Sequence, residues 1–300
     1  MHLRDHEVPH LGVLLDDGNV VDVTAANRAP AFVSLMSLIE AGNSALHAVE
    51  AIVASAQERV PSGSYRLAAP IPRPTQFRDS MCFFQHIEQC ATARRPTNAA
   101  SYQLPDVYRQ QPVYYIGNRL SIAAPEQDIR WPHYSQVMDF ELELACVIGK
   151  QAKNLTLDNA LDHVFGFTIF NDFSARDAQA REMEGRLGPA KGKHFDGGNV
   201  FGPCVVTTDE IGDPQNLRMK ARVNGESWCD NSSATMNWTF AQLLAHISAD
   251  ETLYPGEIIA SGTVGNGCGL EHSRFLHSGD IVELEIEKIG ILRNRVLRQE

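Results

Sequence analysis

The sequence has no Cys-x-x-Cys pair, no basic run and no apolar stretch near the ~18 residues of a membrane span. Its six cysteines are scattered over 300 residues, so free buried thiols are expected rather than disulfides. With 26 Lys+Arg against 37 Asp+Glu, the formal charge of -11 argues against a nucleic-acid backbone as partner. The opening MHLRDHEVPH lacks the apolar core of a signal peptide, and the cytoplasm is the expected location.

Hydrophobic patterning predicts a small N-terminal domain over residues 1–70 and a larger domain over 71–300. In the first, residues 11–24 alternate around Asp-Gly as a hairpin does, and 31–57 show the spacing of two helices. The stretch LAAPIPRPTQF follows, and its three prolines favour an extended connection. The domain boundary is therefore placed near residue 70.

Strands are expected to dominate the second domain, with short helices over 80–92 and 238–249, the latter capped by Asn237. The expected strands are 112–116, 139–148, 164–171, 200–207, 217–223, 226–230, 257–261 and 281–296. Asn224-Gly225 is a strong hairpin signal between two of them. This pattern predicts an α+β, β-dominated fold, built on a curled sheet or barrel-like roll.

The stretch DFELELACVIGK carries carboxylates on one side of a strand that otherwise looks buried. Glu141 and Glu143 share a face, while Phe140, Leu142 and Leu144 project to the other. An amphipathic strand with a solvated acidic face is the simpler interpretation, but the following LACVIG is apolar on both faces. Buried neighbouring carboxylates repel unless a cation lies between them, and oxygen ligands favour Mg²⁺, Mn²⁺ or Ca²⁺ over zinc.

Asp172 follows a second apolar run, VFGFTIFN, and is a candidate third ligand. Catalytic and binding residues are frequent at such strand ends. The same residue could equally cap a helix that begins in the Asn-Asp-x-Ser turn. Local sequence leaves both interpretations open.

The chain resembles the fumarylacetoacetate hydrolase family over most of residues 70 to 296, and the shared motifs follow in the same order. The resemblance is carried by MDFELELACVIGK, GFTIFNDFSARDAQ, LGPAKGKHFD, FGPCVV, YPGEIIASGTVGNG and GDIVELEIEKIGILRNRV. It implies the family's mixed β-roll, a small N-terminal α/β domain, a homodimer and a divalent cation. The implied metal ligands are Glu141, Glu143, Asp172 and Asp79.

The resemblance also implies a catalytic His86, seven residues after Asp79 in DSMCFFQH. Its partner is expected to be Glu271, in place of the His-x-x-Glu of smaller members, where this chain has Gln89 preceded by Glu88. Lys193 matches the active-site lysine, with Lys191 close by. The implied substrate contacts are Arg176, Gln179, Tyr115 and Thr263, and Arg95 is a further candidate.

The resemblance implies metal-assisted hydrolysis of a carbon–carbon bond in a β-diketo or acylpyruvate-type acid, with His86 taking a proton from water. Decarboxylation of a β-keto acid such as oxaloacetate, isomerisation and hydration occur in the same family and remain open. A non-catalytic metal-binding protein on this fold is a further alternative. The expected partner is thus a small 2-oxo acid, with no nucleic acid and no membrane.

Overall fold

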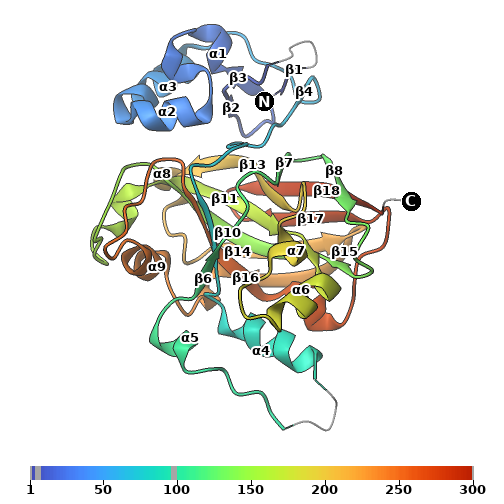
Figure 1. Ribbon diagram of the computed structural model, residues 1–300. Coiled ribbons are helices and arrows are strands. Elements are labelled where there is room, and N and C mark those ends of the chain that lie inside the picture. The colour runs from blue at the N-terminus through green and yellow to red at the C-terminus, as the bar shows by residue number, and fades with distance from the viewer. Residues whose placement is uncertain (1, 4–7, 96–99, 299–300) are drawn as a thin grey trace.

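The structure, a computed structural model, describes residues 2–3, 8–95 and 100–298 of the chain. It is β-dominated, with helices at the edges of two large sheets, so the predicted α+β class is confirmed (Figure 1). No described helix has the length and apolar character needed to cross a membrane.

A seven-stranded sheet forms the centre of the molecule. Its strands are β5 (Phe77–Ser80), β6 (Tyr114–Ile116), β7 (Ile122–Ala123), β10 (Glu141–Ile148), β11 (Val164–Asp172), β13 (Asn199–Thr207) and β16 (Ile258–Cys268). They lie in the order β6-β5-β16-β10-β11-β13-β7. The pairs β16–β5 and β13–β7 are parallel, and the other neighbours are antiparallel.

A five-stranded sheet faces it in the order β15-β14-β17-β18-β8. These strands are β8 (Asp128–Trp131), β14 (Arg218–Val223), β15 (Glu226–Ser232), β17 (Ile281–Ile286) and β18 (Gly290–Arg298). Asn224 and Gly225, with φ of 52° and 81°, form the turn between β14 and β15, so the predicted hairpin is confirmed. The single strand predicted over 281–296 is wrong, because the chain turns at Lys288, where φ is 67°.

Strand β10 lies in the middle of the larger sheet and is buried along its whole length. Leu142 and Leu144 pack into the core shared with the five-stranded sheet, and Ala145 and Val147 pack into a second cluster on the opposite face. Burial on both faces explains why the strand has no solvated side. Glu141 and Glu143 therefore lie inside the protein, which removes the solvated-face interpretation.

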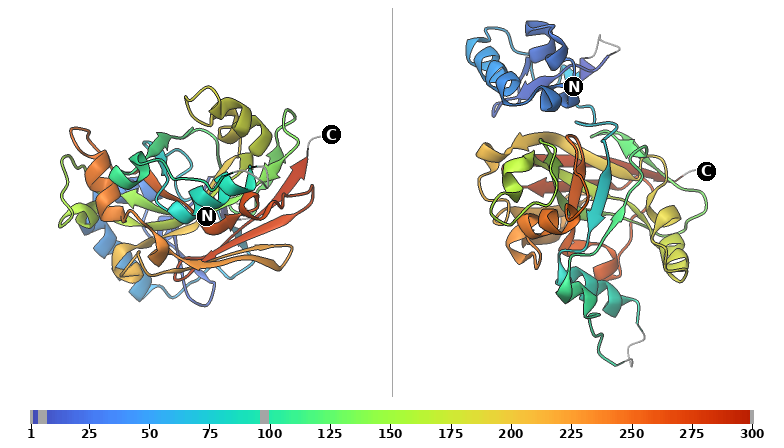
Figure 2. Two further views of the ribbon diagram at one scale, coloured as in Figure 1. Left: turned by 90° about the horizontal axis from the view of Figure 1, so that it is seen from below. Right: turned by 60° about the vertical axis from the view of Figure 1, so that its left-hand side comes forward.

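The N-terminal segment forms a compact group of its own at one end of the sheets (Figures 1 and 2). It contains β1 (His2–Leu3), β2 (Gly12–Leu14), β3 (Val20–Asp22), β4 (Tyr65–Arg66), α1 (Val23–Ala26), α2 (Leu35–Ala41), α3 (Asn43–Ser55) and the 3₁₀ turn η1 (Pro30–Phe32). Ile39 of α2 joins the cluster beneath the large sheet, which ties the segment to the rest of the protein. The division at residue 70 stays a prediction.

The remaining helices lie around the sheets. They are α4 (Phe84–Ala93), α5 (Val107–Gln110), α6 (Arg176–Met183), α7 (Ala190–Lys193), α8 (Thr208–Ile211) and α9 (Phe240–Ile247), with 3₁₀ turns η2 (Ala160–His163), η3 (Ser233–Thr235) and η4 (Leu270–His272). Two short strands, β9 (Met138–Asp139) and β12 (Ser174–Ala175), pair beside the large sheet.

The predicted helix cap at Asn237 is wrong. The cap of α9 is Thr239, two residues later, which forms a reciprocal capping box with Gln242. Asn237 instead accepts a hydrogen bond from the Phe84 backbone N–H, 2.8 Å away, at the start of α4. This hydrogen bond holds the start of α4, the helix that carries His86, against the segment before α9.

Candidate functional site

Three carboxylates meet at one place in the large sheet, and we call them the carboxylate cluster: Asp79, Glu143 and Asp172. They come from β5, β10 and β11, and each offers an oxygen within 4.8 Å of the others. All three residues are buried. Asp79 and Asp172 each have an Oδ1 atom that is buried and lacks a hydrogen-bond partner among the described residues.

Glu143 is held from the opposite side by β16. The Gly262 backbone N–H donates to its Oε2 at 3.0 Å, and the Thr263 hydroxyl donates to its Oε1 at 3.2 Å. At Gly262 φ is +82°, and a Cβ there would lie 2.2 Å from the Ser80 carbonyl oxygen. Glycine is therefore required for this approach. Thr263, predicted to contact substrate, contacts the carboxylate cluster.

Burial raises the pKa of all three carboxyl groups. That of Asp172 rises to about 8, despite the opposing charge of Lys193, and that of Glu143 lies well above its usual value because of burial and Asp79. The pKa of Asp79 is also raised, by burial first. Such a group of like charges favours a bound cation, since a cation would stabilise the ionised forms together.

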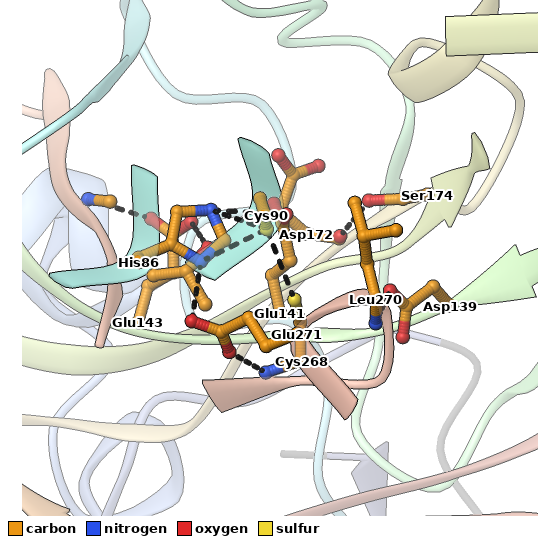
Figure 3. A network of polar contacts seen from close by, with 12 residues as sticks. His86, Cys90, Asp139, Glu141, Glu143, Asp172, Ser174, Cys268, Leu270 and Glu271 are labelled. Atoms are coloured by element: carbon orange, nitrogen blue, oxygen red, sulfur yellow. Dashed lines mark hydrogen bonds and ion pairs between the residues drawn. The ribbon is translucent and has the colours of Figure 1, made fainter. Parts of the chain in front are cut away.

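Glu141, the other half of the Glu-x-Glu pair, lies next to this cluster (Figure 3). Its carboxylate is paired with two cationic side chains. Lys193 Nζ contacts Glu141 Oε2 and lies 2.5 Å from Asp172 Oδ2. Arg176 Nη2 lies 2.8 Å from Glu141 Oε1. Burial alone would raise the pKa of Glu141, but Arg176 and Lys193 hold it well below its usual range.

His86 lies on α4, above the cluster, and is paired with Glu271 of η4. The Nδ1 atom of His86 is 3.1 Å from Glu271 Oε1, and its Nε2 is 3.8 Å from Glu141 Oε1. Backbone N–H groups of Asn266 and Cys268 donate to the Glu271 carboxylate at 3.1 and 2.9 Å, which fixes its orientation. Burial opposes protonation of His86, yet its contacts with Cys268 and Glu271 raise its pKa to about 10.

The alternative partners of His86 lie elsewhere. Glu88 is half exposed and lies 3.9 Å from Arg109. Gln89 exchanges hydrogen bonds with Asn266, at 2.7 Å through its amide nitrogen and 3.1 Å through its amide oxygen. Gln89 therefore positions Asn266 of β16, whose backbone N–H donates to Glu271, instead of contacting the imidazole.

The other predicted substrate contacts surround the same place. The Tyr115 hydroxyl donates to Asp172 Oδ2 at 3.0 Å, and Arg176 Nη1 donates to the Gln179 amide oxygen at 3.0 Å. Between the two candidate lysines, Lys193 is buried among the carboxylates, whereas Lys191 lies over the Tyr134 ring. The helix-cap alternative for Asp172 fails, because Ala175 precedes α6 without a side-chain cap.

Two residues near the site were missed by sequence reasoning. Asp139 accepts hydrogen bonds from the Gly269 and Leu270 backbone N–H groups, at 2.8 and 2.9 Å, and pairs with Arg176 at 2.7 Å. Its place in the Asp-x-Glu-x-Glu alternation was the available signal. Arg94 donates to the Gln179 amide oxygen at 3.2 Å. The candidate Arg95 is exposed, as Arg94 is.

Comparisons with known proteins identify relatives of this chain. The family model described as fumarylacetoacetate (FAA) hydrolase C-terminal matches residues 75–297. This chain belongs to the fumarylacetoacetate hydrolase family. The family resemblance found in the sequence is thereby confirmed.

Relatives within this family carry different activity names. The mitochondrial oxaloacetate tautomerase fahd2 of Xenopus laevis is 33% identical over 297 residues, 98% of this chain and 88% of that protein. A probable 2-hydroxyhepta-2,4-diene-1,7-dioate isomerase from Mycobacterium abscessus matches with a TM-score of 0.75, 29% identity and coverage of 96% and 95%. The fumarylacetoacetate hydrolase of Exiguobacterium antarcticum matches with the same TM-score, identity and coverage.

Proposed function

We propose that this protein is a metal-dependent enzyme for enolisable 2-oxo acids, and that its reaction is the keto–enol tautomerisation of an oxaloacetate-like dicarboxylic acid. The observation that carries the proposal is the position of a histidine–carboxylate pair beside a buried carboxylate cluster. The Xenopus relative matches almost the whole chain and is named an oxaloacetate tautomerase, which favours tautomerisation among the possible reactions.

The residues of the carboxylate cluster fit a hard divalent cation. Their donors are all oxygens, and Asp79 and Asp172 each hold a buried oxygen without a partner in the described structure. Mg²⁺ and Mn²⁺ prefer such ligands, and Ca²⁺ accepts them. A cation bound there would polarise the 2-oxo group of the substrate and favour its enolate form. Glu141 would complete the ligands if Lys193 releases it.

The residues around the carboxylate cluster would transfer the proton and stabilise the charges that form. His86 Nε2 lies 3.8 Å from Glu141 Oε1, and we assign it the proton that leaves C3 of the keto form and returns as the hydroxyl proton of the enol. Glu271 holds Nδ1 and stabilises the imidazolium. Lys193 places a buried positive charge beside the developing oxyanion, and Arg176 orients the Gln179 amide. Tautomerisation only relocates one proton, so no atoms of the substrate leave.

Hydrolysis of a carbon–carbon bond is a second candidate, favoured by the His86–Glu271 contact. A histidine held at Nδ1 by a carboxylate is the arrangement that takes a proton from water. The attacking hydroxide would then add to the distal carbonyl of an acylpyruvate, releasing a carboxylic acid and the enolate of pyruvate. The location in the cytoplasm and the homodimer stay predictions.

The deciding experiment compares substrates under defined metal conditions. Protein treated with a chelator receives Mg²⁺, Mn²⁺ or Zn²⁺ and then enol oxaloacetate, an acylpyruvate or fumarylpyruvate. Accelerated loss of the enol signal, without a released acid or CO₂ beyond the background, supports tautomerisation. A new carboxylic acid supports hydrolysis, and CO₂ supports decarboxylation. Activity restored by zinc alone, or no activity with any of these acids, would contradict the proposal.

A further inference from the structure

A second cluster of ligand-type side chains lies beside the carboxylate cluster, and we call it the thiol–imidazole cluster: His86, Cys90, Cys268 and Glu271. Each residue offers a ligand atom within 4.8 Å of the others. Two members come from α4, one from the end of β16 and one from η4. Figure 3 shows the four side chains turned toward one another.

The spacing of these atoms suits a tetrahedral ion. Cys90 Sγ lies 3.9 Å from Cys268 Sγ and 3.7 Å from His86 Nδ1, and Nδ1 lies 3.1 Å from Glu271 Oε1. A tetrahedral zinc ion with bonds of about 2.0–2.3 Å separates its ligands by roughly 3.3–3.8 Å. These three edges differ from that range by only a few tenths of an ångström. Cys90 Sγ also lies 3.8 Å from Nε2, so the imidazole must turn to direct Nδ1 at the ion.

The residue types also differ from those of the carboxylate cluster. Two thiols and an imidazole select zinc and similar soft ions, whereas carboxylates alone select magnesium or manganese. All four side chains are buried or nearly so, with Cys268 fully buried and Cys90 at 8% exposure. No function assigned to the carboxylate cluster uses either thiol.

From this arrangement we infer a second metal site, in which Zn²⁺ binds His86, Cys90, Cys268 and Glu271 and inhibits the enzyme. The inhibitory role rests on the proposed function, but the site itself does not. Binding displaces one proton from each thiol and one from the His86 imidazolium to solvent. An imidazole that coordinates through Nδ1 carries its proton on Nε2, the atom assigned to proton transfer. The ion would thus remove the base and its carboxylate partner in one step.

Cobalt is the probe for the site, because tetrahedral Co²⁺ with thiolate ligands has characteristic visible and near-ultraviolet absorption. Reduced protein is first saturated with Mg²⁺ and then titrated with Co²⁺. We expect one Co²⁺ per chain with a thiolate-to-cobalt band, and its loss on addition of one equivalent of Zn²⁺. The Cys90→Ser/Cys268→Ser variant should lack the band. Cys204→Ser, which changes a thiol on β13 near the Ile289 carbonyl, should retain it.

The spectrum needs no substrate, so its failure is distinct from a failure of the proposed function. Absence of the band in the wild type, or its persistence in the double variant, would overturn the site. The second measurement is the rate with Mg²⁺ as Zn²⁺ is added, with each variant compared to its own zinc-free rate. Zinc should inhibit the wild type and Cys204→Ser, and spare the double variant. Equal inhibition of all three would place the effect elsewhere and overturn the inhibitory role.

Discussion

The two clusters are neighbours but are built in different ways. Asp79, Glu143 and Asp172 of the carboxylate cluster stand on three strands of one hydrogen-bonded sheet. In the thiol–imidazole cluster, His86 and Cys90 stand one turn apart on a single short helix, facing η4 and the end of β16. The spacing of the carboxylate cluster is set by the strand pairing of the sheet. The spacing of the thiol–imidazole cluster depends on the position of α4.

This difference separates two tasks within one site. The sheet supplies a fixed, oxygen-only place for a cation, and the helix supplies the base that works beside it. Glu141 links them: its Oε1 lies 3.8 Å from His86 Nε2, and Lys193 joins its carboxylate to Asp172 of the carboxylate cluster. Variants of the two clusters should consequently fail in different ways, with metal binding lost in one case and retained in the other.

The largest effect is expected from Glu143→Gln. The substitution removes a ligand charge from the centre of the carboxylate cluster, so Mg²⁺ or Mn²⁺ binding and activity should both disappear. The metal-free variant should be at least as stable to heat as metal-free wild type, because the pKa of Glu143 is raised by burial and by Asp79. Calorimetric metal titration and thermal unfolding measure the two outcomes. Full metal binding in the variant would exclude Glu143 as a ligand.

His86→Ala should lower the rate without removing the metal. Loss of a positioned acid–base group typically costs about 10²–10⁴ in rate. The Mg²⁺ affinity should stay close to that of the wild type, since the imidazole is no ligand of the carboxylate cluster. A rate within a factor of two of the wild type would show that the proton moves by another route, as expected for a decarboxylase.

Sequence patterns located the carboxylate cluster better than the thiol–imidazole cluster, for a physical reason. Glu141 and Glu143 are two residues apart, so strand periodicity places them on one face. Cys90 and Cys268 are 178 positions apart, and only the packing of α4 against β16 brings them together. The family resemblance supplied Asp79 and Glu271, for which local sequence holds no signal.

Glu271→Gln tests the link between the partner carboxylate and the base. The amide keeps the shape but cannot balance an imidazolium, so the rate should fall near the lower end of the 10²–10⁴ range. Glu271 is among the groups that raise the pKa of His86 to about 10. Its neutralisation should lower that pKa, and the limb of the pH–rate profile that reports the free base should move to lower pH. An unchanged profile would dissociate Glu271 from His86.

The smallest effect is expected from Glu88→Gln, the matched control for Glu271→Gln. Glu88 lies on the same helix as His86, but its side chain is 51% exposed and 3.9 Å from Arg109. Exposed ion pairs of this kind contribute little, so the free energy of unfolding should change by less than about 0.5 kcal/mol. The rate and the pH profile should match the wild type, as measured in parallel with Glu271→Gln. The contact between His86 and Glu271 in the structure leaves Glu88 no place beside the imidazole. A loss of rate equal to that of Glu271→Gln would contradict this, because it would mean that α4 turns during catalysis and presents Glu88 to the imidazole.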